Sequence, residues 1–293
     1  MRRPFLGIAT IFAVVAVLLG NAAAQAPIAI VAAENFYGEV ARDISGSQAS
    51  VSSILSNPNQ DPHLFEVDPA TARMVSRADV VIANGAAYDP WMAQLLAASP
   101  RAGRTLLVVA DLVGRQAGDN PHLWYDPATM PALARALAAE LARRDRANAD
   151  TYRQRLEAFL ASLAPLDARI VAMKSAYSGT AVTATEPVFG YMATALGLDM
   201  RHTRFQLAIM NDTEPSASEM AAFESDLRGR AVKVLFYNSQ VTDDTTTRLL
   251  KIATDSGVPV VGVTETKPAG KTYTKWMLDQ LDALAVALGP GRK

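Results

Sequence analysis

The sequence predicts an α/β fold of two Rossmann-like lobes, each built on a parallel sheet, joined by one long connecting helix. Short apolar runs of strand length alternate with helical segments in both halves of the chain. Unbroken β-rich runs of this kind are typical of parallel strands that are covered on both faces. Between the halves, residues 149–176 keep helical apolar spacing. At 1.5 Å per residue they would span roughly 40 Å, which suits a rigid connection between lobes.

The alternation divides the chain into four segments: a signal peptide at 1–24, an N-terminal lobe at 25–146, the connecting helix at 147–176 and a C-terminal lobe at 177–293. Strands are expected at 27–33, 51–55, 79–83, 104–110, 180–185, 204–210, 232–237 and 258–263. Helices are expected at 34–44, 68–77, 91–98, 130–144, 187–196, 242–256 and 273–288. Pro165 falls inside the connecting helix and is expected to kink it, because proline removes a backbone donor.

Residues 1–24 have the organisation of a cleavable export signal. Arg2 and Arg3 precede an apolar run from Leu6 to Leu19, and small residues lead to a cleavage site near Ala24. The alternative is a retained membrane anchor, but the run is short for a span of about 20 residues. No cysteine follows it to carry a lipid. We therefore expect a periplasmic protein with no direct membrane insertion after cleavage.

Composition argues against several classes of partner. Loss of Arg2 and Arg3 leaves 26 of the 28 basic residues against 29 acidic ones, a net charge of −3. That balance argues against nucleic acid and against anionic membrane surfaces. Because the exported chain contains no cysteine, it has no disulfide bonds and depends on a hydrophobic core. Hydrophobic residues make up 50% of the sequence, which is ample for such a core.

Two of the three histidines lie in matching settings. His63 and His122 each occur in the sequence Pro-His-Leu-aromatic, and each segment leads into Asp-Pro-Ala-Thr. In this tetrapeptide Asp68 or Asp126 is expected to cap the helix that follows. Each histidine then lies in a loop just before a helix, where its side chain can point into a cleft. Two independent, inert loop histidines are the alternative, but the repeated frame favours a pair of metal ligands.

Two carboxylates follow strands of the second half, at the edge where open α/β sheets bind ligands. Glu186 ends one strand and begins a helix, so it could instead serve only the helix dipole. Glu265 ends the last strand, and could instead be a solvated loop acid or a partner of Lys267. Two imidazoles and two carboxylates facing each other would neutralise a divalent, borderline or hard first-row metal ion. His202 lies among arginines and is interpreted as a surface residue.

The chain resembles the metal-binding solute-binding proteins of ABC transporters for manganese, zinc and iron, the family often called cluster A-I. The matching segments are residues 33–37 (AENFY), 61–63, 78–85 and 120–124, the long middle helix, the corner from Glu186 through Tyr191 to Gly197-Leu198, and 263–265. They cover essentially the whole mature chain in the right order. The resemblance implies two lobes bridged by one long helix, with the metal bound between them by His63, His122, Glu186 and Glu265.

Two departures from the family pattern concern the carboxylates. Glu186 stands where the zinc branch commonly carries a third histidine, so it resembles the manganese and iron branch; the histidine-rich loop of the zinc branch is absent. Glu265 stands where aspartate is usual and is one methylene longer. Sites of nitrogen and oxygen bind Zn²⁺ more tightly than Mn²⁺ almost regardless of detail. We therefore expect one divalent ion as cargo, Mn²⁺ or Zn²⁺, with Fe²⁺ as a further candidate.

The leading hypothesis is a periplasmic carrier, not an enzyme, that delivers this ion to an ABC permease in the inner membrane. Carriers of this kind are normally monomers, and a rigid connecting helix predicts only a small closure of the lobes. Two alternatives stay open: an exported metal-dependent enzyme that uses the same four residues, and a metallochaperone or adhesin. An enzyme needs an open coordination position and a nearby acid or base. The sequence has no His-Glu-x-x-His or Gly-x-Ser-x-Gly motif.

Overall fold

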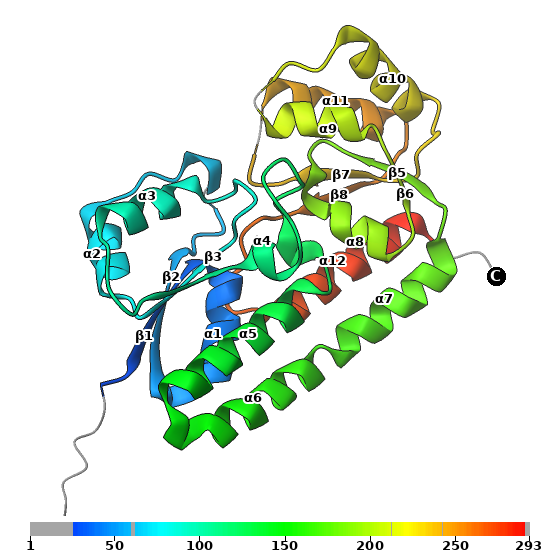
Figure 1. Cartoon of the computed structure of the whole chain (residues 1–293). Helices are drawn as coiled ribbons and strands as arrows, with labels where there is room; N and C mark the ends of the chain where they lie inside the picture. The colour runs from blue at the N-terminus through cyan, green and yellow to red at the C-terminus, as the bar shows by residue number, and fades with distance from the viewer. Residues whose placement is uncertain (1–25, 60–61, 212, 242, 291–293) are drawn as a thin grey trace, which may run out of the picture.

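The computed structural model describes residues 26–59, 62–211, 213–241 and 243–290, without the side chain of His63 (Figure 1). The predicted signal peptide at 1–24 lies outside these residues. Within them, no helix combines the length and apolar character that crossing a membrane requires. The described chain forms two parallel four-stranded sheets with flanking helices, which confirms the predicted fold class.

The first sheet has the strand order β2-β1-β3-β4. Its strands are β1 (Ile28–Glu34), β2 (Ala49–Leu55), β3 (Val80–Ala83) and β4 (Thr105–Val108). The central strand β1 aligns Ile28 with Ala49 and Ile30 with Val80. Alternate residues of β1 are buried in different clusters on the two faces of the sheet, as the two-residue period of a strand requires. Both faces are therefore covered.

The helices of the first lobe separate onto these two faces (Figure 1). One face carries α1 (Asn35–Ser45) and α5 (Thr129–Arg144), and the other carries α2 (Pro69–Arg77) and α3 (Pro90–Ala98). The remaining helices are short: η1 (Gly46–Gln48), η2 (Pro62–Leu64), α4 (Val109–Leu112), η3 (Leu123–Tyr125) and η4 (Arg146–Asn148).

The two predicted helix caps have different outcomes. The Asp68 carboxylate accepts the backbone N–H of Thr71 at 2.6 Å and caps α2 as expected. Asp126 accepts the N–H of Ala128 at 3.0 Å, which caps only a turn, and α5 begins at Thr129. The reason is local: η3 ends directly at Asp126, so the chain completes a turn before the α-helix starts.

The second sheet has the equivalent order β6-β5-β7-β8. Its strands are β5 (Ala181–Ala184), β6 (Asp199–Arg201), β7 (Leu235–Asn238) and β8 (Val260–Val263). Its helices are η5 (Pro187–Phe189), α8 (Gly190–Ala195), α9 (Thr203–Met210), α10 (Ala217–Arg228), α11 (Asp244–Asp255) and α12 (Tyr273–Leu288).

The strand predicted at 204–210 is wrong, because this segment is the helix α9. The edge strand is instead β6, which is only three residues long and mostly polar. In α9, Phe205 and Ile209 are one helical turn apart and both pack in the cluster beneath α10 and α11. That four-residue spacing favours helix over strand. His202, with φ 58°, makes the left-handed turn between β6 and α9.

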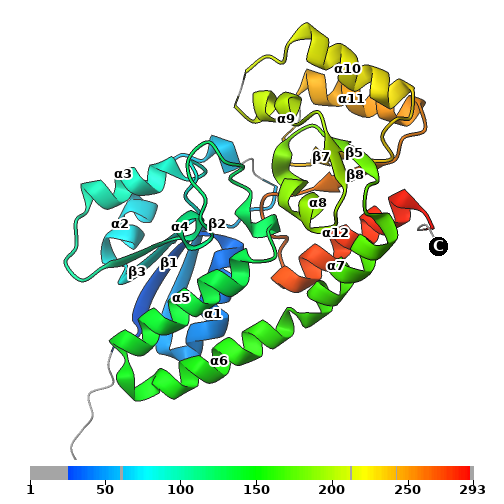
Figure 2. The ribbon, with the colours of Figure 1, turned by 45° about the vertical axis from the view of Figure 1, so that its right-hand side comes forward.

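The connecting segment consists of two helices, α6 (Ala149–Ser162) and α7 (Ala164–Tyr177), with a break at Leu163. Pro165 lies in the first turn of α7. Its missing N–H removes a helical hydrogen bond, which accounts for the break. In both views the two helices follow each other along one side of the molecule, from the first lobe to the second (Figures 1 and 2).

One hydrophobic cluster runs through both lobes. The rings of Phe36 and Trp124, from the first lobe, have centroids 4.8 Å apart, and Phe36 lies 5.9 Å from Trp276 of α12. Tyr125 lies 5.4 Å from Phe189 of the second lobe. The lobes therefore share a core in addition to the connecting helices. This continuity supports the expectation of a small closure, while the four-segment division of the chain stays a prediction.

Candidate metal centre

His122 is fully buried, between Pro121 and the short helix η3. Its Nδ1 lies 2.7 Å from Oδ1 of Asn120, which also accepts the backbone N–H of His122 at 3.1 Å. Because an amide oxygen can only accept, Nδ1 carries a proton, so in the neutral ring Nε2 is the nitrogen that presents a lone pair. Nε2 has no hydrogen-bond partner among the described residues and lies 3.5 Å from Oε2 of Glu265. A neutral imidazole held in this way is suited to bind a metal ion.

Glu265 follows β8 and is 1% exposed. Its Oε2 accepts the hydroxyl of Tyr88 at 2.8 Å, and its Oε1 accepts Nδ2 of Asn238 at 2.5 Å. Its backbone N–H donates to Oε1 of Gln240 at 2.6 Å. Each carboxyl oxygen of Glu265 therefore accepts a hydrogen bond from a neutral donor. Lys267, the alternative partner for Glu265, pairs instead with Glu39 at 3.1 Å.

Glu186 lies two residues beyond the end of β5 and directly precedes η5, with 7% of its surface exposed. It makes no side-chain capping bond to η5, so its position is not explained by helix capping. Its Oε2 accepts Nδ2 of Asn238 at 2.8 Å. Asn238 ends β7 and donates to Glu186 and Glu265 alike, so one buried amide links the two carboxylates. Both carboxylates therefore lie together at the carboxyl edge of the second sheet.

Three of the four predicted ligands thus lie in one region: His122 contacts Glu265, and Asn238 connects Glu265 to Glu186. His63 belongs to η2, and its side chain lies outside the description. Among the residues that are described, no three histidine, aspartate or glutamate side chains form a group tight enough to hold an ion. The four-ligand set stays a prediction.

Sequence reasoning missed the neutral residues that surround these groups: Asn120, Tyr88, Asn238 and Gln240. A signal existed for Asn238, because it directly follows the predicted strand 232–237, just as Glu186 follows the predicted strand 180–185. His202 was predicted at the surface but is half-buried: its Nε2 lies 3.2 Å from Oδ2 of Asp226, and its ring packs 5.0 Å from that of Phe223. It takes no part in the site.

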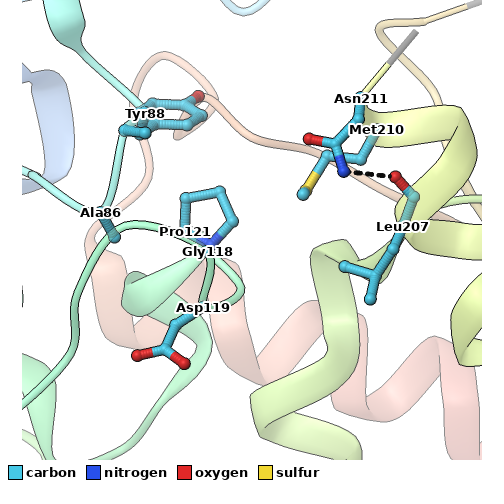
Figure 3. A pocket seen from close by; sticks show the side chains of 9 residues that line it. Ala86, Tyr88, Gly118, Asp119, Pro121, Leu207, Met210 and Asn211 are labelled. Carbon is cyan, nitrogen blue, oxygen red and sulfur yellow. Dashed lines mark hydrogen bonds between the residues drawn. The ribbon is translucent and has the colours of Figure 1, made fainter. Parts of the chain in front are cut away.

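A cavity of about 210 Å³ lies beside this region, between the two lobes. Its lining residues are Ala86, Ala87, Tyr88, Gly118, Asp119, Pro121, Leu207, Met210 and Asn211. Figure 3 shows Tyr88 and Pro121 on one side and Met210 and Asn211 on the other. Tyr88 bonds to Glu265, and Pro121 precedes His122, so these two residues separate the cavity from the buried site. Ala86 and Ala87 have φ values of 50° and 64°, a left-handed turn that is strained for alanine.

The fold and this buried group of imidazole and carboxylates define a two-lobed solute-binding protein. Residues 30–287 match the model of the ZnuA family, described as the periplasmic component A of the zinc-uptake complex, and the chain belongs to this family. The family consists of solute-binding proteins rather than enzymes.

Several similar proteins are named as components of metal transporters. The metal ABC transporter substrate-binding lipoprotein ScbA of Streptococcus cristatus is 23% identical over 281 residues, which cover 88% of each chain. The iron ABC transporter substrate-binding lipoprotein MtsA of Streptococcus pyogenes serotype M1 is 23% identical, over 86% of this chain and 87% of its own.

Solved structures share the fold. The periplasmic zinc-binding protein TroA of Treponema pallidum superposes with a TM-score of 0.74 and 19% identity, covering 89% of this chain and 98% of its own. The solute-binding protein FpvC of Pseudomonas aeruginosa, in complex with Mn²⁺, gives a TM-score of 0.73 and 20% identity over the same shares. At this level of identity the structures show the two-lobed architecture.

Proposed function

We propose that this protein is an exported solute-binding protein that captures one divalent transition-metal ion between its lobes and delivers it to an ABC permease. The observation that carries the proposal is the buried Nε2 of His122, which faces the Glu265 carboxylate at 3.5 Å, with Glu186 joined to Glu265 through Asn238. Buried charges of this kind are normally paired or bound to a metal. Membership of a zinc-uptake family and relatives named for metal or iron transport support the same conclusion.

The proposed ligands are His63, His122, Glu186 and Glu265. Asn120 holds the imidazole of His122 in the tautomer that a metal needs. Two carboxylates would compensate the double positive charge of the ion, and mixed nitrogen and oxygen ligands suit Mn²⁺, Zn²⁺ or Fe²⁺. The ion is cargo, so a saturated site is expected rather than the open position of a catalytic metal.

The first experiment is a competitive titration of the metal-free mature protein with Zn²⁺ and Mn²⁺, beside a Glu186→Ala variant. We expect one equivalent of metal to bind with submicromolar affinity, Zn²⁺ more tightly than Mn²⁺. The variant should lose most of this affinity, because it lacks one of the two carboxylates that compensate the charge of the ion. If neither metal binds the unmodified protein, the proposed function is wrong.

We further propose that the mature protein is a periplasmic monomer, cleaved near Ala24, whose permease lies in the inner membrane. The basic and apolar organisation of residues 1–24 supports export. The intact mass of protein recovered from the periplasm tests this proposal. We expect a chain that begins at Gln25 and elutes as a monomer; a mass that includes residues 1–24 or a lipid would contradict it.

A further inference from the structure

We infer that Asn35 is a positioning residue for the metal ligand Glu265: it holds this carboxylate of the second lobe against the first lobe, beside His122. The inference rests on the proposed function. Asn35 belongs to the segment Ala33-Glu34-Asn35-Phe36-Tyr37, which contains none of the four proposed ligands. Asn35 begins α1 directly after β1, which lies between β2 and β3 in the first sheet.

The side-chain amide of Asn35 forms two hydrogen bonds with the backbone of Lys267. Nδ2 donates to the carbonyl oxygen of Lys267 at 2.8 Å, and Oδ1 accepts the N–H of Lys267 at 3.2 Å. The amide thus satisfies both backbone groups of one residue, much as a neighbouring strand would. Lys267 is only two residues beyond Glu265. These two hydrogen bonds therefore hold the backbone next to the proposed ligand Glu265.

A second residue of α1 secures the same segment. Glu39 binds the ammonium group of Lys267 at 3.1 Å and accepts the N–H of Tyr273, at the start of α12, at 2.7 Å. The ammonium group of Lys267 also donates to the carbonyl of Lys271 at 2.6 Å. Lys267 is 9% exposed, so this ion pair is largely shielded from solvent. Residues 267–273 are therefore attached along α1 of the first lobe.

Contacts with the first lobe continue toward Glu265 itself. The hydroxyl of Tyr125 donates to the carbonyl of Thr264 at 2.8 Å, and that of Tyr88 donates to Glu265 at 2.8 Å. Glu186 is bonded to Asn238 of the second sheet, and the same amide also binds Glu265. Glu265 comes from the second lobe in sequence but is held with His122 in space. Glu265 is thus bonded to both lobes, and Asn35 keeps its backbone against the first lobe.

The test is a double-mutant cycle on the full mature protein with Asn35→Ala, Glu265→Ala and the double variant, probed with Zn²⁺. Asn35→Ala should weaken Zn²⁺ binding by about 10- to 100-fold, the usual effect of losing a residue that supports a ligand, chiefly through faster release to a chelating dye. In the Glu265→Ala background the same change should have almost no further effect, because the residue that Asn35 positions is already absent. Asn35→Asp should not restore slow release, because its second oxygen would face the Lys267 carbonyl without donating to it.

Two further measurements separate positioning from general destabilisation. The visible absorption of bound Co²⁺ reports ligand number and should change in Asn35→Ala. Asn148→Ala removes an amide that donates to Asp145 at 2.7 Å, outside the site, and should leave both the spectrum and the release rate unchanged. Release from Asn35→Ala at the unmodified rate, or effects of Asn35 and Glu265 that simply add, would overturn the inference. Failure of the unmodified protein to bind metal would overturn the proposed function, and with it this inference.

Discussion

Replacing His122 by alanine is expected to lower the affinity for Zn²⁺ and Mn²⁺ by more than about 100-fold, the upper range for residues that only support a ligand. The imidazole is fully buried, its tautomer is set by Asn120, and its Nε2 faces Glu265. Removing it would take away a nitrogen ligand and leave a space that alanine cannot fill. Competition against a chelator of known affinity measures the effect.

His202→Ala is the matched control for this experiment. His202 is paired with Asp226 and packs on Phe223, so its loss should leave metal stoichiometry and affinity unchanged. Thermal unfolding of both metal-free variants checks that each is folded. Full affinity in His122→Ala, or an equal loss in both variants, would show that His122 is not a ligand.

Glu34→Gln is expected to stabilise the metal-free protein at neutral and alkaline pH. Glu34 is 1% exposed, and neither carboxyl oxygen has a hydrogen-bond partner in the described part of the chain. Burial, followed by the nearby charge of Asp89, raises the pKa of Glu34 well above its usual value. Asp89 accepts the N–H groups of Asn84 and Gly85 at 2.7 and 2.9 Å, which leaves Glu34 as the carboxyl without donors.

The direction of the pH effect follows from this raised pKa. Below the usual pKa of glutamate, about 4.5, both the folded and the unfolded chain hold the proton and Glu34 has no effect. As the pH rises above that value, the unfolded chain releases the proton before the folded chain does, so the free energy of unfolding falls. Glutamine is neutral throughout and avoids this loss. We expect a gain of at least about 1 kcal/mol at pH 8, because each unit by which a pKa is raised corresponds to about 1.4 kcal/mol.

Thermal unfolding of the metal-free protein at pH 4, 6 and 8 measures this prediction. At about 2–4 °C per kcal/mol for a chain of this size, the Tm of Glu34→Gln should rise by several degrees at pH 8 and hardly at all at pH 4. Glu157→Gln, at an exposed position of α6, is the control and should show no such dependence. A Glu34→Gln variant that is less stable at pH 8 would contradict the prediction.

The fold was largely predictable because most of its strands are apolar runs and several helices carry clear starts or stops. α12 was predicted at 273–288 and lies at Tyr273–Leu288. The error at 204–210 arose because β6 has three residues, Asp199–Arg201, with no apolar pattern to detect. Its role as an edge strand depends on pairing with β5, which is a tertiary property. The apolar residues of α9 were then assigned to a strand, although their spacing follows the helical period.

The site was predictable to the extent that strand ends locate it. Glu186 and Glu265 were placed by the rule that ligands gather beyond the carboxyl ends of parallel strands, and the structure brings both to Asn238. Asn120 and Asn238 had weak signals, as the residue two positions before His122 and the residue after a predicted strand. Tyr88 had none, because its bond to Glu265 joins segments 177 positions apart. The long-range bonds of Asn35 to Lys267, 232 positions apart, could not be inferred from local pattern at all.

The hydrophobic cluster common to both lobes has a consequence for how the molecule unfolds. Phe36, Trp124 and Trp276 form continuous aromatic packing across the junction, so neither lobe can lose its structure without exposing part of the other's interior. Calorimetry should accordingly record one cooperative transition rather than two. Residues 26–146 contain a complete four-stranded sheet. Produced as an isolated fragment, they would expose the aromatic surface that the second lobe covers, and we expect this fragment to aggregate.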